Sequence, residues 1–234
     1  MKAMVFAAGC GTRLRPMTDT RPKALVEVAG GTLLEQVLGR LVGAGVTEVI
    51  VNLHHLGGQI PPFLEKHNHF GLQRVAYSQE PVLLDTGGGL KQAAWFFDDG
   101  NPFFVHNVDV LSDIDLGALV RAHRRSGALA TLAVMVRPTS RPLYFDADGR
   151  LSGRRTPDQG DDFVRIPHGA LTALGFGGIH AVSPAIFDKL AESGSFSITD
   201  AYLHLAGAGE VIQAHRVDGA KWRDCGRPED LRPL

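Results

Sequence analysis

The chain has 234 residues, of which 44% are hydrophobic and 21% charged, so it can bury one large core or at most two small ones. Its formal net charge of -1 balances 24 basic against 25 acidic residues with no long run of either sign, which argues against nucleic-acid or membrane-surface partners. No apolar stretch approaches the ~20 residues of a membrane span, and two cysteines give no disulfide framework. We expect one soluble, cytoplasmic domain over 1–234.

Short apolar runs alternate with amphipathic segments along the chain. Residues 2–7 predict a strand, 32–44 a helix and 47–53 a second strand, which together form a βαβ unit. The later predicted elements are strands over 74–79, 101–109, 129–136, 173–183 and 210–217, and helices over 89–97, 116–125, 185–193 and 198–209. This pattern predicts an α/β fold, with a mostly parallel sheet covered by helices on both faces and ligands bound beyond the carboxyl ends of the strands.

Residues 139–172 interrupt this pattern. The stretch FDADGRLSG indicates a hairpin around Asp148 and Gly149, and the following TPDQGDDFVRIPHG is polar and irregular. We expect this segment to be an irregular insertion over the functional site and not a separate domain.

A glycine-rich loop, GCGTRLRPMTDTRPK, follows the first predicted strand. Gly9 and Gly11 allow the backbone to bring its N–H groups close to a phosphate. The Rossmann fingerprint would have a glycine at Leu14, and a Walker loop would end in Gly-Lys-Ser/Thr. Arg13 and Lys23 suit a polyphosphate, although a tight turn with two solvated cations is the simpler alternative.

The stretch FAAGCGTRLRPMTDTRPKALVEVAG resembles the signature of the sugar-1-phosphate nucleotidylyltransferases, L-A-x-G-x-G-x-R-x-x-P-x-T followed by P-K. The residues in register are Ala8, Gly9, Gly11, Thr12, Arg13, Pro16, Thr18, Pro22 and Lys23. LLDTGGGLKQA at 83–93, VHNVDVL at 105–111 and KWRDCGRPEDL at 221–231 also agree, so the resemblance covers essentially the whole chain. It implies a three-layer α/β/α Rossmann-like nucleotidyltransferase fold with a mixed, mostly parallel sheet. The implied reaction transfers a nucleotidyl group from an NTP to a sugar 1-phosphate and releases pyrophosphate.

This reaction brings two anions together, so its main need is neutralisation of charge and in-line alignment. Arg13 has the planar fork to hold the β- and γ-phosphates, as the matching family arginine does, and Lys23 suits the α-phosphate or the sugar phosphate. Asp109 and Asp224 are expected to hold one Mg²⁺ through hard oxygens. Asp109 is therefore assigned to the catalytic group together with Arg13 and Lys23.

The resemblance also implies the binding residues. The predicted nucleotide-binding set is Ala8, Gly9, Gly11, Thr12, Arg13, Gln79, Glu80, Thr86, Gly87 and Gly88. The predicted sugar-phosphate-binding set is Lys23, Asn107, Gly177 and Gly178, with the 139–172 insertion on the same sugar side. Gly87, Gly88 and Gly89 should lie at a helix start and permit close approach of a base or ribose, while Gln79 and Glu80 are candidates to contact the base edge.

The base and the sugar remain open between alternatives. DTGGG and GGIHAVSP at 177–184 are similar to N-acetylmuramate 1-phosphate uridylyltransferases, so uridylyl transfer from UTP to an N-acetylmuramate-type sugar 1-phosphate is expected. A GTP-dependent guanylyltransferase acting on mannose or heptose 1-phosphate is one alternative. A catalytically silent nucleotide or nucleotide-sugar sensor is another, because Val108 stands where the family has glycine. The E-E-K-P element that many relatives use near the sugar is absent.

Two further expectations concern the end of the chain. It stops soon after RPEDLRPL, so we expect a single activity without the C-terminal β-helix domain of some relatives. Cys10 lies in the glycine loop and Cys225 follows Asp224, so these two loops should converge on one crevice, without a disulfide.

Overall fold

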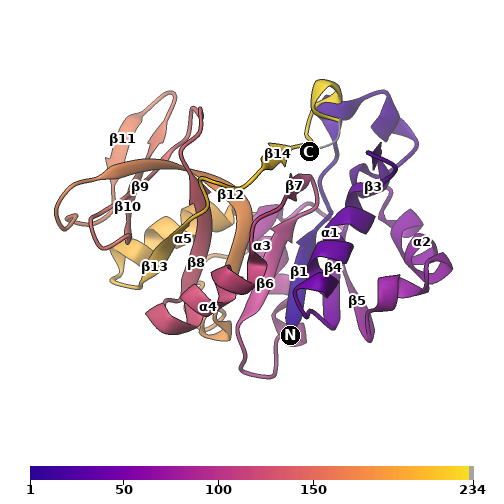
Figure 1. Ribbon diagram of the computed structural model, residues 1–234, viewed down its shortest axis with the longest axis horizontal. Helices are drawn as coiled ribbons and strands as arrows, with labels where there is room; N and C mark the ends of the chain where they lie inside the picture. The colour runs from indigo at the N-terminus through magenta and orange to yellow at the C-terminus, as the bar shows by residue number, and fades with distance from the viewer. Residues whose placement is uncertain (232–234) are drawn as a thin grey trace.

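The computed structural model describes residues 1–231, and its largest element is a mixed sheet of ten strands (Figure 1). The strands are β1 (Lys2–Phe6), β4 (Glu48–Leu53), β5 (Arg74–Gln79), β6 (Phe103–Asn107), β8 (Ala130–Met135), β9 (Leu143–Phe145), β10 (Leu151–Thr156), β11 (Gly160–Phe163), β12 (Thr172–Val182) and β13 (Ile212–Arg216). They follow the order β11-β10-β9-β12-β6-β1-β4-β5, with β8 paired to β12 and β13 paired to β8. Each strand predicted from the sequence is therefore present, as β1, β4, β5, β6, β8, β12 or β13.

The centre of the sheet is parallel. In its register Ala3 of β1 lies between Val49 of β4 and Phe104 of β6, and β5 pairs with β4 in the same direction. β12 joins β6 antiparallel. The carboxyl ends of β1, β4 and β6 therefore lie at one edge of the sheet, as the βαβ pattern requires.

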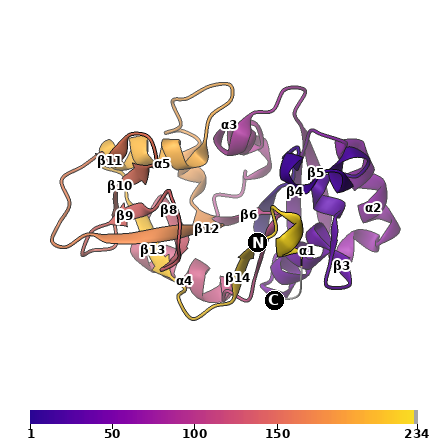
Figure 2. The same ribbon diagram turned by 90° about the horizontal axis from the view of Figure 1, so that it is seen from above.

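Helices cover both faces of the sheet (Figure 2). They are α1 (Leu33–Gly43), α2 (Ile60–Lys66), α3 (Asp85–Gln92), α4 (Leu116–Ser126) and α5 (Ile198–Gly207). Ala3 and Val5 pack in the apolar cluster that contains residues of α1, α2 and α4, whereas Met4 and Phe6 pack in the cluster that contains residues of α3 and α5. Since side chains alternate across a strand, β1 serves both cores. The predicted three-layer α/β/α fold is confirmed.

Several predicted elements differ in the structure. The helix predicted over 185–193 is wrong: only a 3₁₀ turn, Pro184–Ile186, forms there. The Nζ of Lys91 donates to the carbonyls of Leu190 and Glu192 over 2.7 and 2.6 Å, which holds the end of this segment against α3. The helix predicted over 89–97 begins earlier, at Asp85.

The segment 139–172 is more regular than expected. It contains β9, β10 and β11, which form an antiparallel extension of the sheet next to the first residues of β12. Two small sheets complete the fold: β2 (Glu27–Val28) with β3 (Gly31–Thr32), and β7 (Val110–Ser112) with β14 (Trp222–Asp224). None of the helices within residues 1–231 has the length and apolar character needed to cross a membrane.

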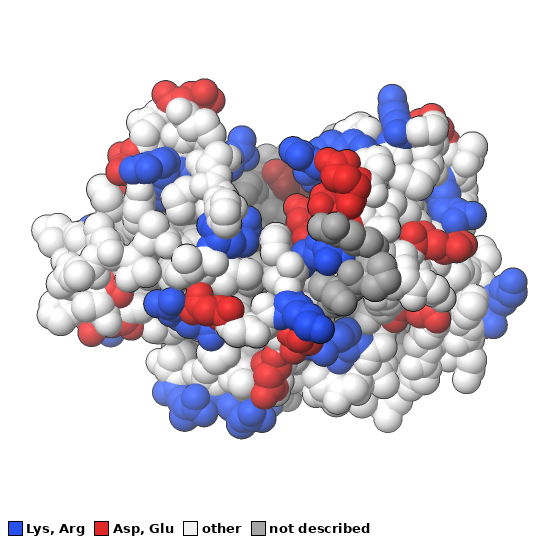
Figure 3. Space-filling view, turned by 45° about the horizontal axis from the view of Figure 1, so that its top comes forward, with Lys and Arg blue, Asp and Glu red and all other residues white. Residues whose placement is uncertain are grey.

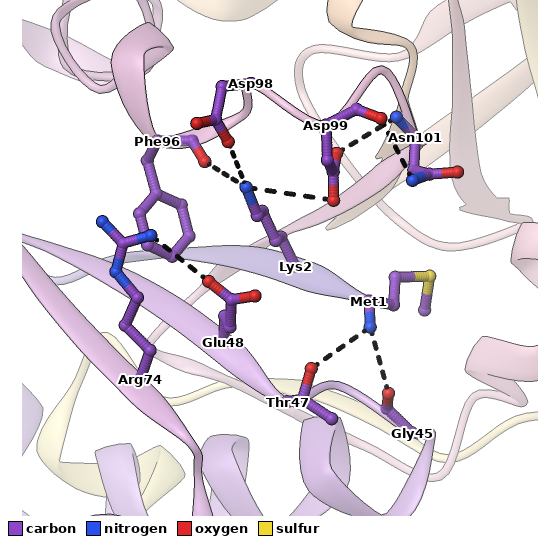
Figure 4. Close-up of polar contacts among 10 residues, drawn as sticks. All are labelled: Met1, Lys2, Gly45, Thr47, Glu48, Arg74, Phe96, Asp98, Asp99 and Asn101. Carbon is purple, nitrogen blue, oxygen red and sulfur yellow. Dashed lines mark hydrogen bonds and ion pairs between the residues drawn. The ribbon is translucent and has the colours of Figure 1, made fainter.

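Polar contacts fasten the amino edge of the sheet (Figure 4). Lys2 of β1 donates to the carbonyl of Phe96 over 2.8 Å and to Asp98, and the amino group of Met1 contacts Thr47 Oγ1 at 3.4 Å. Lys2 and the amino group of Met1 are thus engaged in structural contacts at this edge, whereas ligands of such sheets bind at the opposite, carboxyl edge.

Three histidines, called here the buried histidines, have at most 2% of their surface exposed: His106, His123 and His180. Burial disfavours the charged imidazolium, which lowers the pKa of His106 and His123 to about 4 and that of His180 to about 3. These side chains are therefore neutral parts of the core near pH 7.

Candidate active site

The loop after β1 places its glycines at the carboxyl edge of the sheet. Gly11 has a φ of +62°, and a Cβ atom there would lie 2.8 Å from Cγ2 of Thr18, so both backbone conformation and space require glycine. Thr18 Oγ1 donates to the carbonyl of Gly11 over 2.8 Å. Leu14, where a Rossmann loop would have glycine, is fully buried in the core. Gly9 has open space on its Cβ side, which leaves one face of the turn accessible.

Arg13 extends from this loop toward the last part of the chain. It is exposed in the 3₁₀ turn Thr12–Leu14, whereas Ala8 before it is buried. A Cβ atom at Gly226 would lie 2.5 Å from Nη2 of Arg13 and 2.7 Å from Oδ1 of Asp224. The glycine loop and the loop after β14 therefore converge, as predicted, and bring the Arg13 guanidinium beside Asp224.

Lys23 and Asp109 form an ion pair in this region. Lys23 is 8% exposed, and its Nζ contacts Oδ2 of Asp109. Asp109 follows β6 in the turn that leads to β7. Val108, at the position where the family has glycine, is 3% exposed, packs in the core and donates its N–H to the carbonyl of Phe6 over 3.1 Å. The valine is thus accommodated by apolar packing, while Asp109 stays in contact with Lys23.

The pairing of β7 with β14 brings the second carboxylate to the same place. Asp224 lies opposite Val110 in this pairing, and the N–H of Cys225 donates to the carbonyl of Asp109 over 2.7 Å. Oδ1 of Asp224 accepts a hydrogen bond from the N–H of Gly226 over 2.8 Å. Burial raises the pKa of the Cys225 thiol to about 11, and the negative charges of Asp109 and Asp224 act in the same direction.

The two carboxylates fit a Mg²⁺ ion that is bound together with phosphate. Among residues 1–231, no group of three or more His, Cys, Asp or Glu side chains is placed to hold a metal. Mg²⁺ prefers oxygen ligands, and it is usually bound by one or two carboxylates together with substrate phosphates and water. The pair Asp109 and Asp224 therefore has the donor chemistry for a metal that arrives with a nucleotide.

The three glycines of the DTGGG motif lie in the first turns of α3, and close packing explains them. A Cβ atom at Gly87 would lie 2.4 Å from the ring of Phe196, and one at Gly88 would lie 2.2 Å from the carbonyl of Gly194. The N–H groups of Gly87 and Gly88 contact the carbonyl of Phe196 at 2.8 and 3.3 Å, and Thr86 Oγ1 accepts from the N–H of Ile198. The nucleotide contact of these residues stays a prediction.

Gln79 and Glu80, the two candidates for the base edge, differ in exposure. Glu80 is 1% exposed, and its carboxylate accepts hydrogen bonds from Asn52 Nδ2 over 2.7 Å and from the N–H of Leu84 over 3.0 Å. The Oδ1 of Asn52 accepts in turn from the N–H of Ala7 over 2.7 Å. The carboxylate of Glu80 therefore links the end of β1, through Asn52, to the residues before α3, whereas Gln79 is exposed. The contact of either side chain with a base stays a prediction.

Asn52 was missed in the sequence, although a polar side chain inside the apolar run VIVNL was an available signal. A buried amide that joins two loops needs partners on both sides, and only the tertiary structure supplies them.

Asn107, Gly177 and Gly178 meet where β12 passes the end of β6. A Cβ atom at Gly178, whose φ is +72°, would lie 2.8 Å from Nδ2 of Asn107. The indole Nε1 of Trp222 donates to the carbonyl of Gly177 over 2.8 Å, and Trp222 lies two residues before Asp224. The predicted sugar-side residues are thus brought together beside the carboxylate pair.

A hollow in the molecular surface accompanies this arrangement (Figure 3). It lies between the part of the molecule that carries β9–β11 and the part that carries α1 and α2, and basic and acidic side chains gather at its rim. A charged hollow at the carboxyl edge of a parallel sheet is typical of a site for phosphorylated ligands.

Comparison with known proteins agrees with this geometry. Residues 2–233 match the family model described as nucleotidyl transferase. The chain is 39% identical to N-acetylmuramate alpha-1-phosphate uridylyltransferase of Neisseria meningitidis serogroup B, over 97% of this chain and 93% of that protein. It is 36% identical to the protein of the same name from Caulobacter vibrioides, over 97% and 92% of the two chains. The crystal structure of HddC from Yersinia pseudotuberculosis has the same fold, with a TM-score of 0.77 at 22% identity over 98% of this chain and 95% of that one.

The fold and the site define a nucleotidyltransferase of the α/β/α class. The chain belongs to the nucleotidyl transferase family, and the resemblance to sugar-1-phosphate nucleotidylyltransferases seen in the sequence is confirmed.

Proposed function

We propose that the chain is a Mg²⁺-dependent sugar-1-phosphate nucleotidylyltransferase that transfers a uridylyl group from UTP to an N-acetylmuramate-type sugar 1-phosphate. The observation that carries the proposal is the convergence of Arg13, Lys23, Asp109 and Asp224 from three separate segments, the glycine-rich loop, the turn after β6 and β14, on one edge of the sheet. The two uridylyltransferase relatives, at 39% and 36% identity, support the choice of base and sugar.

In this proposal the phosphates of UTP lie over the glycine loop. Arg13, exposed and beside Gly226, holds the β- and γ-phosphates through its planar fork and stabilises the pyrophosphate that leaves. Lys23 is held by Asp109 at the base of the loop, where its ammonium neutralises charge on the α-phosphate or on the attacking sugar phosphate. These two cations therefore act on different parts of the triphosphate.

Asp109 and Asp224 would hold the Mg²⁺ ion, whose bound charge would polarise the phosphate oxygens and lower the repulsion between the two anions. The carboxylates themselves are positioned by backbone contacts, because the N–H of Cys225 ties the two loops together and that of Gly226 orients Asp224. Asn107, Gly177 and Gly178 form the wall against which the sugar 1-phosphate would be aligned for in-line attack.

The test is a steady-state panel of UTP, GTP, dTTP and ATP, each with the 1-phosphates of N-acetylmuramate, N-acetylglucosamine, glucose and mannose, read as pyrophosphate release. The proposal predicts the highest kcat/KM for UTP with N-acetylmuramate 1-phosphate, and loss of turnover with EDTA. Preference for GTP with mannose 1-phosphate would replace it with the guanylyltransferase alternative. NTP binding without turnover for any pair would favour a silent sensor.

A further inference from the structure

A cavity with several arginines in its lining lies next to the sugar-side wall of Asn107, Gly177 and Gly178. It has a volume of about 770 Å³ and lies between the end of β8, the β9–β11 extension and the start of α5. Its arginines are Arg137, Arg141, Arg154 and Arg155. Guanidinium groups suit anionic ligands, and three aspartates, Asp85, Asp158 and Asp200, line the same cavity.

The arginines of this cavity are not equivalent. Arg154 forms an ion pair with Asp200, and Arg155 makes two hydrogen bonds to Asp161, at 2.7 and 3.0 Å. Within residues 1–231, Arg137 has no ion-pair partner, and its Nε is buried without a hydrogen-bond partner. The carboxylates of Asp200 and Asp161 therefore neutralise Arg154 and Arg155, whereas Arg137 and Arg141 have no carboxylate partner among the described residues.

Arg137 is nevertheless held in a defined position. Its guanidinium carbon lies 4.4 Å from the centroid of the Trp222 ring, and its Nη2 donates to the carbonyl of Phe176 over 2.9 Å. A Cβ atom at Gly175 would lie 2.6 Å from Nε of Arg137, so the glycine leaves room for the arginine. An ordered guanidinium loses less conformational entropy when it binds a ligand than a flexible one.

The position of Arg137 connects the cavity to the active site. Trp222, on which it stacks, begins the strand that ends at Asp224, and Phe176, which accepts its hydrogen bond, precedes Gly177. Desolvation lowers the pKa of Arg137, and the negative charge of Asp224 opposes that effect. Because arginine stays protonated in proteins, a half-buried guanidinium without a carboxylate partner is stabilised by an incoming anion.

We propose that Arg137 is a further substrate-binding residue, whose guanidinium binds an anionic oxygen group of the sugar 1-phosphate. This inference rests on the proposed function. The anionic group is either the 1-phosphate itself or a carboxylate carried by the sugar ring, and both present the oxygen pair that a guanidinium fork binds. In either case Arg137 supplies a cation on the sugar side, where the E-E-K-P element is absent from the sequence.

The experiment compares Arg137→Met and Arg137→Lys with Arg155→Met, a control that removes a neutralised arginine from the same cavity. For Arg137→Met we expect KM for N-acetylmuramate 1-phosphate to rise about ten-fold or more, with KM for UTP within about two-fold of wild type. Arg137→Lys should recover part of the loss, since it keeps the charge without the fork. Arg155→Met should change neither KM by more than about two-fold.

The same variants with N-acetylglucosamine 1-phosphate, which lacks the carboxylate substituent of N-acetylmuramate, identify the anion. A KM rise with both sugars assigns Arg137 to the 1-phosphate, and a rise only with N-acetylmuramate 1-phosphate assigns it to the carboxylate. An unchanged sugar KM in Arg137→Met, or an equal rise in Arg155→Met, would overturn the inference while wild-type turnover still upheld the proposed function.

Binding of N-acetylmuramate 1-phosphate can be measured directly if a variant or the wild type shows no turnover. Trp222 fluorescence in a Trp95→Phe background reports on the ring that stacks with Arg137, and thermal melting verifies that each variant is folded. Saturable quenching by N-acetylmuramate 1-phosphate that is lost in Arg137→Met supports the inference. Quenching that is retained at the same concentration contradicts it. Absence of turnover in a folded wild type that shows this binding would overturn the proposed function alone.

Discussion

Replacing Gly226 by alanine tests the contact between the two loops of the site. The added Cβ would lie 2.5 Å from Nη2 and 2.9 Å from Cζ of Arg13, while an uncrowded contact is about 3.5 Å. The guanidinium would therefore have to move by about 1 Å, and a displacement of that size in a catalytic group costs up to about 10²-fold in rate. We expect kcat/KM for UTP to fall about 10- to 100-fold in Gly226→Ala.

The fold should tolerate this change, because Arg13 is exposed and can turn away from the new methyl group. We expect the free energy of unfolding to change by less than about 1 kcal/mol, because the atoms nearest to the new methyl group belong to the side chains of Arg13 and Asp224 and not to the backbone. Gly219→Ala is the matched control, since a Cβ atom at Gly219 has no neighbour within 4 Å. Pyrophosphate release at saturating sugar 1-phosphate and calorimetric melting measure the two quantities.

A double-mutant cycle separates the effect on Arg13 from an effect on Asp224, whose Oδ1 would lie 2.7 Å from the same Cβ. If displacement of the guanidinium is the cause, Gly226→Ala should have little further effect in an Arg13→Met background. Additive losses in the cycle, or wild-type kcat/KM in Gly226→Ala, would refute the placement of Arg13 over the phosphates.

Four further outcomes are expected. Asp109→Asn and Asp224→Asn should each abolish Mg²⁺-dependent turnover in folded protein, because each removes a proposed metal ligand. Arg13→Lys should lower kcat/KM about 10²-fold and Arg15→Lys less than about two-fold, since the latter side chain forms only an exposed ion pair. Between pH 6.5 and about 4 the buried histidines bind fewer protons in the folded protein than in the unfolded chain. The free energy of unfolding should therefore fall as the pH drops below 6.5, by up to about 1.4 kcal/mol per histidine and pH unit. Mg-UTP should protect the partly exposed Cys10 from alkylation, while the second cysteine stays unlabelled in folded protein.

Each of these expectations has a defined contrary result. Near-normal Mg²⁺-dependent rates in either aspartate variant would remove the metal assignment, and equal kinetic losses in the two arginine variants would show that the fork is misplaced. Chemical denaturation that gives the same stability at pH 5 and pH 7 would contradict the neutral state of the buried histidines. Peptide mapping that finds unchanged Cys10 labelling with Mg-UTP would place the nucleotide elsewhere.

Local signals in the sequence were sufficient for much of the fold. α1 begins at a capping box formed by Thr32 and Glu35, and its apolar residues follow a helical period, so both its start and its buried face could be predicted. Likewise the alternation of strands and helices identified the layers. The segment 185–193 has a similar apolar pattern but forms only a 3₁₀ turn at Pro184–Ile186. Two carbonyls near its end accept hydrogen bonds from Lys91, about a hundred residues away, and no local pattern reveals this contact.

In the candidate site too, local sequence signals predict some features, and others depend on tertiary contacts. Gly11 and its neighbours could be recognised because a positive φ and a phosphate loop both need glycine. The burial of Glu80 could not be predicted from the sequence, because it depends on a hydrogen bond from Asn52 of another strand. The role of the α3 glycines as ligand contacts stays a prediction. Their close packing, of Gly87 and Gly88 against the loop around Phe196 and of Gly89 against Glu80, is visible only in the tertiary structure.

The central claim is that this chain joins a nucleotide to a sugar 1-phosphate, and ³¹P NMR of a single reaction mixture tests it most directly. With UTP, N-acetylmuramate 1-phosphate, Mg²⁺ and wild-type protein, the account predicts the paired resonances of a nucleoside diphosphate sugar together with an equal amount of pyrophosphate. Asp109→Asn should leave the substrate resonances unchanged. Hydrolysis of UTP without a sugar product, or unchanged substrates with bound UTP, would contradict the account.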